Sequence, residues 1–207
     1  KERMAAFKAH VEDLGGLDFE RFSAVDGKKI ENPKSFNFPT KKSLGSLGCL
    51  LSHYQLIKNA FKEKSESILI LEDDTRFSPQ LKENLGKSLK ELPKDWDFLF
   101  LGGQFFNIPS SESTSSSVFK GAGVGGFAYA VSRKGAEKVY TVMEEKLKCN
   151  RELLHNDIEF YYGAYHYLNA YRVYPWVAHY TSGLSTHRFT SLPETYSVSF
   201  FYKNEIN

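Results

Sequence analysis

Three consecutive carboxylates, Glu72, Asp73 and Asp74, directly follow an apolar run that ends at Leu71. Acids crowded at the end of a buried strand repel one another and raise each other's pKa unless a cation neutralises them. Their hard oxygen atoms suit Mg²⁺ or Mn²⁺, so a metal site that holds a diphosphate is one interpretation. The alternative is a helix N-terminus or turn, where acids complement the helix dipole. If successive residues alternate faces, Glu72 and Asp74 point one way and Asp73 the other.

A second acid at a strand end is Asp26, in the turn signal Asp26-Gly27 after the apolar segment 19–25. In an α/β sheet, ligands bind outside the carboxyl ends of the strands. One carboxylate can hydrogen-bond ribose hydroxyls while another ligates a metal that bridges the phosphates. Glu72 and Asp74 are candidates for dividing those two roles.

Asp157 and Glu159, close to His155, form a second acidic pair. A carboxylate in this setting can act as the general base that deprotonates an acceptor hydroxyl, although a helix N-terminal acid cluster would look the same. His179 follows a strand-like segment and is either a nitrogen ligand to the same metal or a structural histidine. His53, next to Ser52, has no acid partner that the sequence identifies, so a hydrolase triad is not predicted.

The composition is that of one globular domain, which we expect to span residues 1–207. The 27 basic and 25 acidic residues give a net charge of +2 without a basic stripe, which argues against nucleic acid as a partner. No apolar run approaches the roughly 20 residues of a transmembrane helix, and no signal peptide is evident. We expect a cytoplasmic protein, with peripheral contact to the inner face of the membrane as one option. Two cysteines without CxxC spacing fit a reducing compartment but would also permit one bridge.

Helical and strand-like patterns alternate along the chain, which predicts an α/β sheet flanked by helices. Helices are expected at 3–14, closed by Gly15-Gly16, from Ser46 as the N-cap to about residue 61, and at 134–148. Buried strands are expected at 19–25, 68–71, 97–101, 127–131 and 171–174. The last twenty residues look irregular.

Two loops stand out between these elements. The serine-rich stretch within 109–118 has nothing apolar to bury and is predicted to be an exposed, flexible loop, either a lid or a plain surface loop. The glycine cluster 121–126 precedes a strand, whereas a dinucleotide fingerprint follows one, so it is not read as that motif. Gly125 and Gly126 offer either a backbone surface for a sugar-like ligand or a simple bend.

Several motifs in order resemble glycosyltransferase family 25, which includes bacterial lipopolysaccharide and procollagen galactosyltransferases. They are Phe22-Ser23-Ala24-Val25-Asp26-Gly27, Leu47-Gly48-Cys49-Leu50-Leu51-Ser52-His53, Ile70-Leu71-Glu72-Asp73-Asp74, Trp96-Asp97 through Gly102, and Ala130-Val131-Ser132 with Gly135-Ala136. Two departures from the family pattern are visible. Ser46 replaces a common Glu, and the Ile-Asn-Leu-like strand expected ahead of Arg3 is absent, which suggests a truncated N-terminus.

The resemblance implies a GT-A type fold with a single mixed, mostly parallel sheet and an inverting, metal-dependent transfer of a sugar. The donor would be a UDP-sugar, UDP-galactose first and UDP-glucose second, and the cofactor Mn²⁺ or Mg²⁺. The implied metal ligands are Asp74, Glu72 and His179. Donor-binding residues would be Asp26, Gly27, Glu72, Asp73, Gly125 and Gly126, and the catalytic acids Asp157, as base, and Glu159.

The expected acceptor is a hydroxyl of a glycan, a lipooligosaccharide or lipopolysaccharide, or a glycosylated protein of the hydroxylysine type. The alternative from another class is a non-catalytic sugar-nucleotide or glycan-binding module that keeps the fold. The missing first strand and Ser46 support that alternative.

Overall fold

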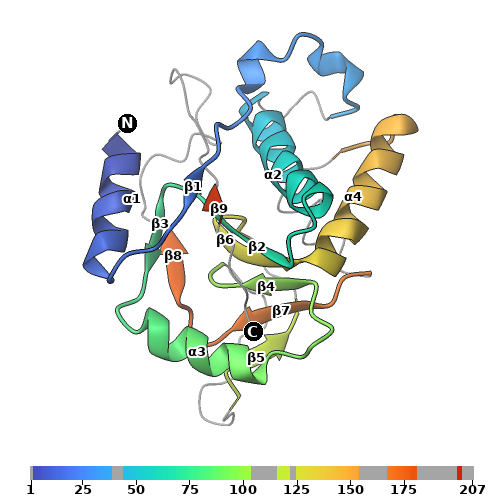
Figure 1. The fold of residues 1–207 in the computed structure, drawn as a ribbon. Coiled ribbons are helices and arrows are strands. Elements are labelled where there is room, and N and C mark those ends of the chain that lie inside the picture. Colours follow the sequence, from blue (N-terminus) through green and yellow to red (C-terminus); the bar gives the residue numbers. More distant parts are fainter. Residues whose placement is uncertain are drawn as a thin grey trace.

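The computed structural model describes residues 2–38, 44–103, 116–121, 125–153, 167–180 and 200–201 (Figure 1). Its helices are α1 (Glu2–Asp13), α2 (Leu44–Lys62), α3 (Leu81–Glu91) and α4 (Arg133–Lys148), with 3₁₀ turns at Gly27–Lys29 and Pro33–Ser35. Its strands are β1 (Glu20–Arg21), β2 (Ser67–Leu71), β3 (Thr75–Phe77), β4 (Phe98–Phe100), β5 (Val118–Lys120), β6 (Ala128–Ser132), β7 (Ala170–Val173), β8 (Ala178–Tyr180) and β9 (Phe200–Phe201).

The centre of the fold is a five-stranded mixed sheet in the order β2-β6-β4-β7-β5. The predicted α/β class with a mixed sheet is confirmed, but the expectation of a mostly parallel sheet is wrong. Among the described strands, β4 and β7 pair in parallel, whereas β2 with β6, β6 with β4, and β7 with β5 are antiparallel. The chain leaves β4, forms β5 at the far edge and returns to insert β6 between β2 and β4, so this part is not a βαβ crossover.

Two short sheets accompany the central one, so the expectation of a single sheet is also wrong. β1 pairs with β9, and β3 pairs with β8. The second pairing matters for function, because β3 starts directly after the acidic residues and β8 contains His179. Strands this short are hard to detect from sequence, since two or three residues show no clear alternation.

Helices cover both faces of the central sheet. Successive residues of β2 and β4 alternate between the faces, as a strand requires. One core cluster joins α2 and α4 to the sheet and includes Leu50, Ile57, Ile68, Ile70, Phe98, Phe100, Val139 and Met143. The other joins α1 and α3 to the opposite face and includes Phe7, Val11, Leu71, Leu99 and Leu101, with Leu81, Leu85 and Leu89 packed against it. Figure 1 shows α2 beside α4, and α1 beside β3 and β8.

Local signals explain most element boundaries. α1 ends at Asp13 because Gly15 and Gly16 adopt φ of 93° and 82°, and the Gly16 amide donates to the Val11 carbonyl. α4 begins after Ser132, whose hydroxyl accepts a hydrogen bond from the Gly135 amide. The prediction of Ser46 as a helix N-cap is wrong: α2 already begins at Leu44, and Ser46 is buried within it.

Other predicted segments differ in length or were missed. Only Glu20–Arg21 of the predicted strand 19–25 is a strand, and α3, β3 and β8 had no counterpart in the prediction. Of the serine-rich loop, Ser117 is buried and Val118 begins β5, whereas residues 109–115 lie outside the described part of the chain. None of the described helices has the length and apolar character to cross a membrane.

Two glycines allow the Asp26 turn to lie directly on α2. A Cβ on Gly48 would be 2.5 Å from the Val25 carbonyl oxygen, and one on Gly27 would be 1.8 Å from the Leu44 carbonyl oxygen. The Val25 amide also donates to the Ser52 hydroxyl, which itself donates to the Gly48 carbonyl. Backbone contact of this kind requires glycine on both sides of the interface.

We therefore expect Gly48→Ala to lower the free energy of unfolding by about 1–3 kcal/mol, the usual cost of forcing an extra methyl group into a packed interface. Gly86→Ala is the matched control, because a Cβ there in α3 meets no atom within 4 Å. Helix propensity should make this control neutral or up to about 1 kcal/mol more stable. Denaturant unfolding of both variants measures the difference, and equal midpoints would contradict the close-approach explanation.

Candidate functional site

The three acids lie in a tight turn that follows β2. The Thr75 amide donates to the Glu72 carbonyl over 3.0 Å, which closes a β-turn with Asp73 and Asp74 at its corners. The Phe127 carbonyl fixes this turn by accepting two hydrogen bonds of 2.7 Å, from the Glu72 amide and from the Thr75 hydroxyl. The acids are thus part of a turn anchored to the segment just before β6.

The side chains of this turn point toward two different helices. Arg3 of α1 forms ion pairs with Asp73 and with Asp74, the latter at 2.9 Å. Glu72 instead faces α2, where its Oε1 lies 3.4 Å from Nε2 of His53. The expected alternation, with Glu72 and Asp74 on one side, does not occur because the corners of a turn leave the extended conformation that alternation requires.

Burial makes negative charge costly at these corners. Burial, followed by repulsion from Glu72, raises the pKa of Asp74 from 3.8 to about 6, although Arg3 acts in the opposite direction. The pKa of Asp73 is raised as well, mainly by burial. One guanidinium therefore does not fully compensate the acidic turn, which leaves it with an affinity for further positive charge.

Gly125 and Gly102 lie against the Phe127 ring and the neighbouring backbone beside this turn. A Cβ on Gly125 would lie 3.2 Å from the Phe127 ring and 3.3 Å from the Gly103 Cα, and Gly125 has a φ of 126°. A Cβ on Gly102 would lie 2.1 Å from the Ala178 carbonyl oxygen. The glycines thus let the end of β4, the start of β6 and β8 meet at the acidic turn, as the expected close backbone approach requires. Gly126 is buried in the same segment.

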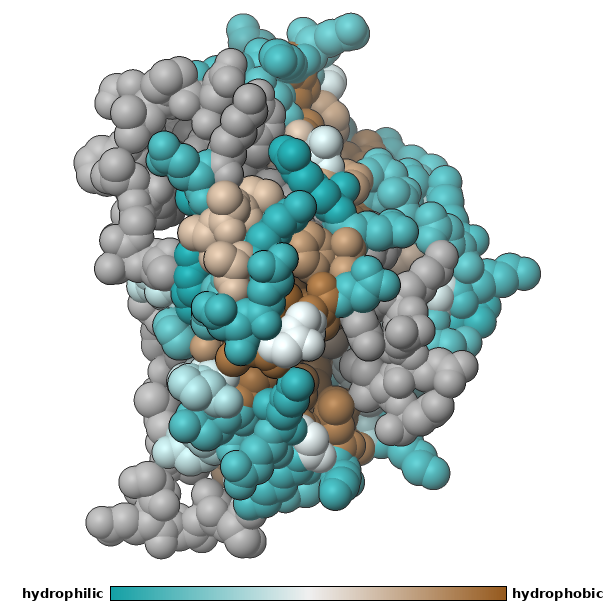
Figure 2. Space-filling view, turned by 60° about the vertical axis from the view of Figure 1, so that its left-hand side comes forward, coloured by the Kyte–Doolittle hydropathy of each residue, from teal (hydrophilic) through white to brown (hydrophobic). Residues whose placement is uncertain are grey.

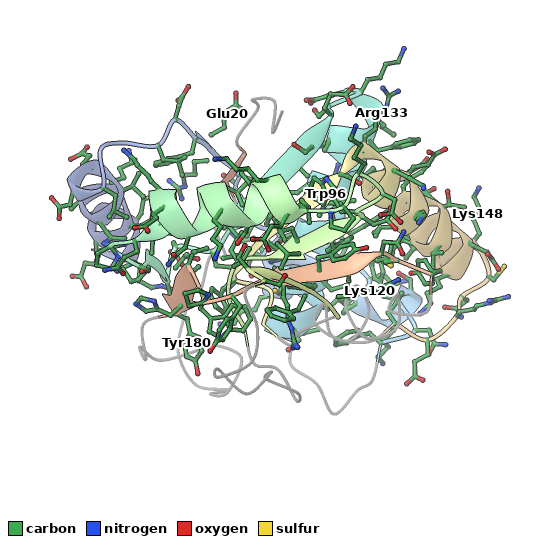
Figure 3. All side chains as sticks on the ribbon, turned by 90° about the horizontal axis from the view of Figure 1, so that it is seen from below. Glu20, Trp96, Lys120, Arg133, Lys148 and Tyr180 are labelled. Carbon is green, nitrogen blue, oxygen red and sulfur yellow. The ribbon has the colours of Figure 1, made fainter. Side chains whose placement is uncertain are left out.

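His179 reaches this region through strand pairing. In the β3–β8 register, His179 lies opposite Arg76 and Tyr180 opposite Thr75, the last residue of the acidic turn. His179 is exposed, and Tyr180 is 51% exposed with its ring edge on Phe127. Figure 3 shows Tyr180 at the end of β8, projecting outward. The structure therefore brings His179 to the neighbouring strand, two positions beyond Asp74 in register.

The face around α1 is mostly polar. His10 lies two helical turns after Arg3 on the same side of α1. Its Nε2 accepts a 2.8 Å hydrogen bond from the Phe77 amide, and its pKa is lowered by burial and by the nearby Arg76. Figure 2, which brings this side forward, shows polar side chains around a band of apolar ones. α1 is thus attached to β3 by its polar contacts as well as by its core residues.

Asp26 is the N-cap of the 3₁₀ turn Gly27–Lys29. Its Oδ1 accepts a 3.0 Å hydrogen bond from the Lys28 amide, and Lys29 lies 3.8 Å from Oδ2. The turn packs against Gly48 and Ser52 of α2, and the neighbouring residues Cys49 and His53 face Glu72. Asp26 and Gly27 are therefore connected to the acidic turn through α2. Asp157 and Glu159 lie outside the described residues, as do His155 and His187.

Sequence reasoning missed two partners of the acids. Arg3 was noted only as a landmark, because nothing local links it to a turn 70 positions away. His53 was set aside for want of an acid partner, yet Glu72 is that partner, and Tyr129 Oη lies 2.7 Å from Nδ1. The available signal was the i, i+4 spacing of Cys49 and His53, which places both side chains on one face of α2.

Comparison with known proteins gives a consistent result. The family model described as glycosyltransferase family 25 (LPS biosynthesis protein) matches residues 1–154. A glycosyltransferase 25 family member from Aedes aegypti is 28% identical over 149 residues, covering 63% of this chain and 24% of that protein. Procollagen galactosyltransferase 2 from Mus musculus is 29% identical over a match that covers 46% of this chain and 16% of that protein. Procollagen galactosyltransferase 1-B from Xenopus laevis is 30% identical over a match that covers 59% of this chain and 23% of that protein. The chain spans about a quarter of these relatives' length or less.

The raised pKa of Asp74 gives a stability prediction with a definite sign. A carboxyl whose folded pKa of about 6 exceeds its unfolded value stabilises the fold below the unfolded pKa, and this contribution is lost as pH rises through 6. Asp74→Asn should therefore gain stability relative to the wild type by about 2 kcal/mol between pH 4 and pH 8. Urea unfolding across this range measures the difference, with exposed Glu83→Gln as the control. Parallel curves for the wild type and Asp74→Asn would contradict the burial argument.

Proposed function

Because this chain belongs to glycosyltransferase family 25, we propose that it transfers galactose, or glucose as the second choice, from a UDP-sugar to an acceptor hydroxyl. The observation that carries the proposal is the buried acidic turn, with two carboxylates aimed at one point and a raised pKa at Asp74. The printed names of the curated relatives, which include procollagen galactosyltransferases, support galactose as the sugar.

The donor site in this proposal is the edge of the sheet where the turn, the glycines and β8 meet. We assign the fold to the GT-A type, with Asp26, Gly27, Glu72, Asp73, Gly125 and Gly126 as the donor-binding residues. The close approach of Gly102 to the Ala178 carbonyl and of Gly125 to Gly103 supports this placement, since it brings the end of β4, the start of β6 and β8 together. The acceptor in the proposal is a hydroxyl of a glycan, lipooligosaccharide or glycosylated protein.

The acidic turn fits a hard divalent cation. Its carboxylate oxygens are the ligands that Mn²⁺ and Mg²⁺ prefer, and the buried charge exceeds what Arg3 neutralises. Asp74 would be the main ligand, and His179 would add a nitrogen from β8. Glu72, the third ligand that the resemblance implies, faces α2 in this structure and would have to turn toward the ion. When bound, such an ion supplies charge neutralisation for the diphosphate of the leaving nucleotide. Arg3 would have to move from Asp74 or share it with the ion.

We expect Mn²⁺-dependent release of UDP from UDP-galactose in the presence of an acceptor. Asp74→Asn should lower the rate of this release about 100-fold, which corresponds to ~2.7 kcal/mol in the activation free energy. The reason is that Asp74 is the proposed main ligand, and the substitution removes one of the charged oxygen atoms that would hold the ion. Coupled detection of UDP measures the rate, and Glu83→Gln on α3 serves as the control acid. Unchanged turnover in Asp74→Asn would refute the metal assignment.

Asp157 is the proposed base that removes the acceptor proton, with Glu159 as the second catalytic acid. Replacing a general base usually costs 10²- to 10⁴-fold in rate, so Asp157→Asn should lower kcat by about that factor and leave donor binding unchanged. Glu159→Gln is the matched comparison and should cost less. Steady-state kinetics across pH, with donor affinity from calorimetry, separates the two roles. Equal effects of both variants would overturn the choice of Asp157.

A non-catalytic sugar-nucleotide or glycan-binding module is the second candidate. The Arg3 guanidinium already pairs with Asp73 and Asp74, which favours an acid cluster that needs no metal. Such a module would bind UDP-galactose or a glycan in calorimetry without Mn²⁺ and release no UDP with a broad acceptor panel. Donor binding that requires Mn²⁺, followed by turnover, supports the transferase instead.

A further inference from the structure

Three potential metal ligands meet between α2 and the end of β2. Cys49 and His53 lie one helical turn apart on α2, and Glu72 directly follows β2. One ligand atom from each residue, the sulfur, an imidazole nitrogen and a carboxylate oxygen, lies within 4.8 Å of the others. Cys49 and His53 are 3% and 0% exposed, so this cluster is largely shielded from solvent.

His53 is oriented as a ligand would be. Its Nδ1 lies 2.7 Å from the Tyr129 hydroxyl, and its imidazole ring stacks on the ring of that tyrosine. Its Nε2 points into the cluster, 3.4 Å from Glu72 Oε1, and has no hydrogen-bond partner within the described part of the chain. Buried polar atoms rarely stay without a hydrogen bond. Metal-binding histidines usually donate their other ring N–H to an oxygen, and Tyr129 Oη is placed to accept it.

The donor set selects the ion. Thiolate, imidazole and carboxylate together suit Zn²⁺, whereas Mn²⁺ and Mg²⁺ favour oxygen-rich sites without a thiolate. Around a tetrahedral zinc, bond lengths of about 2.0–2.3 Å place neighbouring ligand atoms about 3.3–3.8 Å apart. The 3.4 Å separation of His53 and Glu72 lies in that range, and the remaining separations of up to 4.8 Å need only small side-chain rotations.

We propose that Cys49, His53 and Glu72 bind a Zn²⁺ ion, with Tyr129 orienting the histidine. In the metal-bound arrangement, the dication balances the negative charges of a Cys49 thiolate and the Glu72 carboxylate. The three protein ligands leave a fourth tetrahedral position for water. The ion would fix α2 to the start of the acidic turn and thereby position Asp73 and Asp74. The competing arrangement without metal is an intact Cys49 thiol beside a His53–Glu72 pair.

Cobalt substitution distinguishes the two arrangements, because thiolate bound to Co²⁺ produces a near-ultraviolet charge-transfer band and a thiol does not. Titration of the full chain with Co²⁺ should produce this band and saturate at one ion per chain, and Zn²⁺ should abolish it. Cys49→Ser, which preserves size, should eliminate the band. Tyr129→Phe should keep the band and weaken Co²⁺ affinity by about 10- to 100-fold, the usual effect of losing an outer partner.

Two control variants locate the site. Cys149→Ser changes the exposed cysteine and should leave the band and the affinity unchanged. Asp74→Asn should also leave them unchanged, because Asp74 faces Arg3 and not the cluster. No sugar donor enters the experiment, so its failure would not count against sugar transfer, and a failed transfer assay would not count against zinc.

Absence of the band at saturating Co²⁺ would overturn the proposal, as would an identical band in Cys49→Ser or a band lost in Cys149→Ser. Circular dichroism monitors folding of each variant. If Cys49→Ser does not fold, Glu72→Gln at the more exposed end of the cluster takes its place. A reduced Co²⁺ affinity in Glu72→Gln supports the site, and an unchanged affinity refutes it.

Discussion

The structure depends on how the charge of one turn is balanced. Glu72, Asp73 and Asp74 occupy a buried corner whose backbone is fixed by the Phe127 carbonyl, so the acids cannot move apart to relieve their repulsion. The surrounding elements supply the compensation instead: α1 contributes Arg3, and α2 places His53 beside Glu72. Ion pairs alone rarely justify buried charge, since desolvation can exceed the Coulombic gain. A fold that keeps several partly buried carboxylates despite this desolvation cost is typical of a functional site, such as one that binds a cation.

The helices predicted from sequence were those whose signals are local. α2 and α4 have long apolar stripes, and α1 ends at a glycine pair, so periodicity and the glycine pair located these helices to within about three residues. Strand direction was a different matter. β6 is antiparallel because the chain returns from an edge strand, and no pattern within residues 128–132 encodes that path. The short β3 and β8 likewise exist because each pairs with the other, which is a tertiary property.

The same division applies to the site. The sequence located the acids correctly at the end of β2, since residue type and strand position are both local. It could not assign their directions, because turn geometry and two distant helices decide them. Asp73, for which the resemblance implies only donor contact, shares Arg3 with Asp74, and Glu72 faces His53, for which the sequence identifies no acid partner. Roles for Asp157 and His179 rest on order along the chain, and for His179 the β3–β8 register adds spatial support.

Three of the motifs that carry the family resemblance form one packed unit around α2. The Val25 amide bonds Ser52, Gly27 and Gly48 lie in backbone contact, and Cys49 and His53 face Glu72. These residues therefore mostly position the acidic turn. In the proposed transferase, acceptor recognition would then depend on surfaces outside this unit. The family match over residues 1–154 contains this whole unit, so it includes the residues that hold the acidic turn in place.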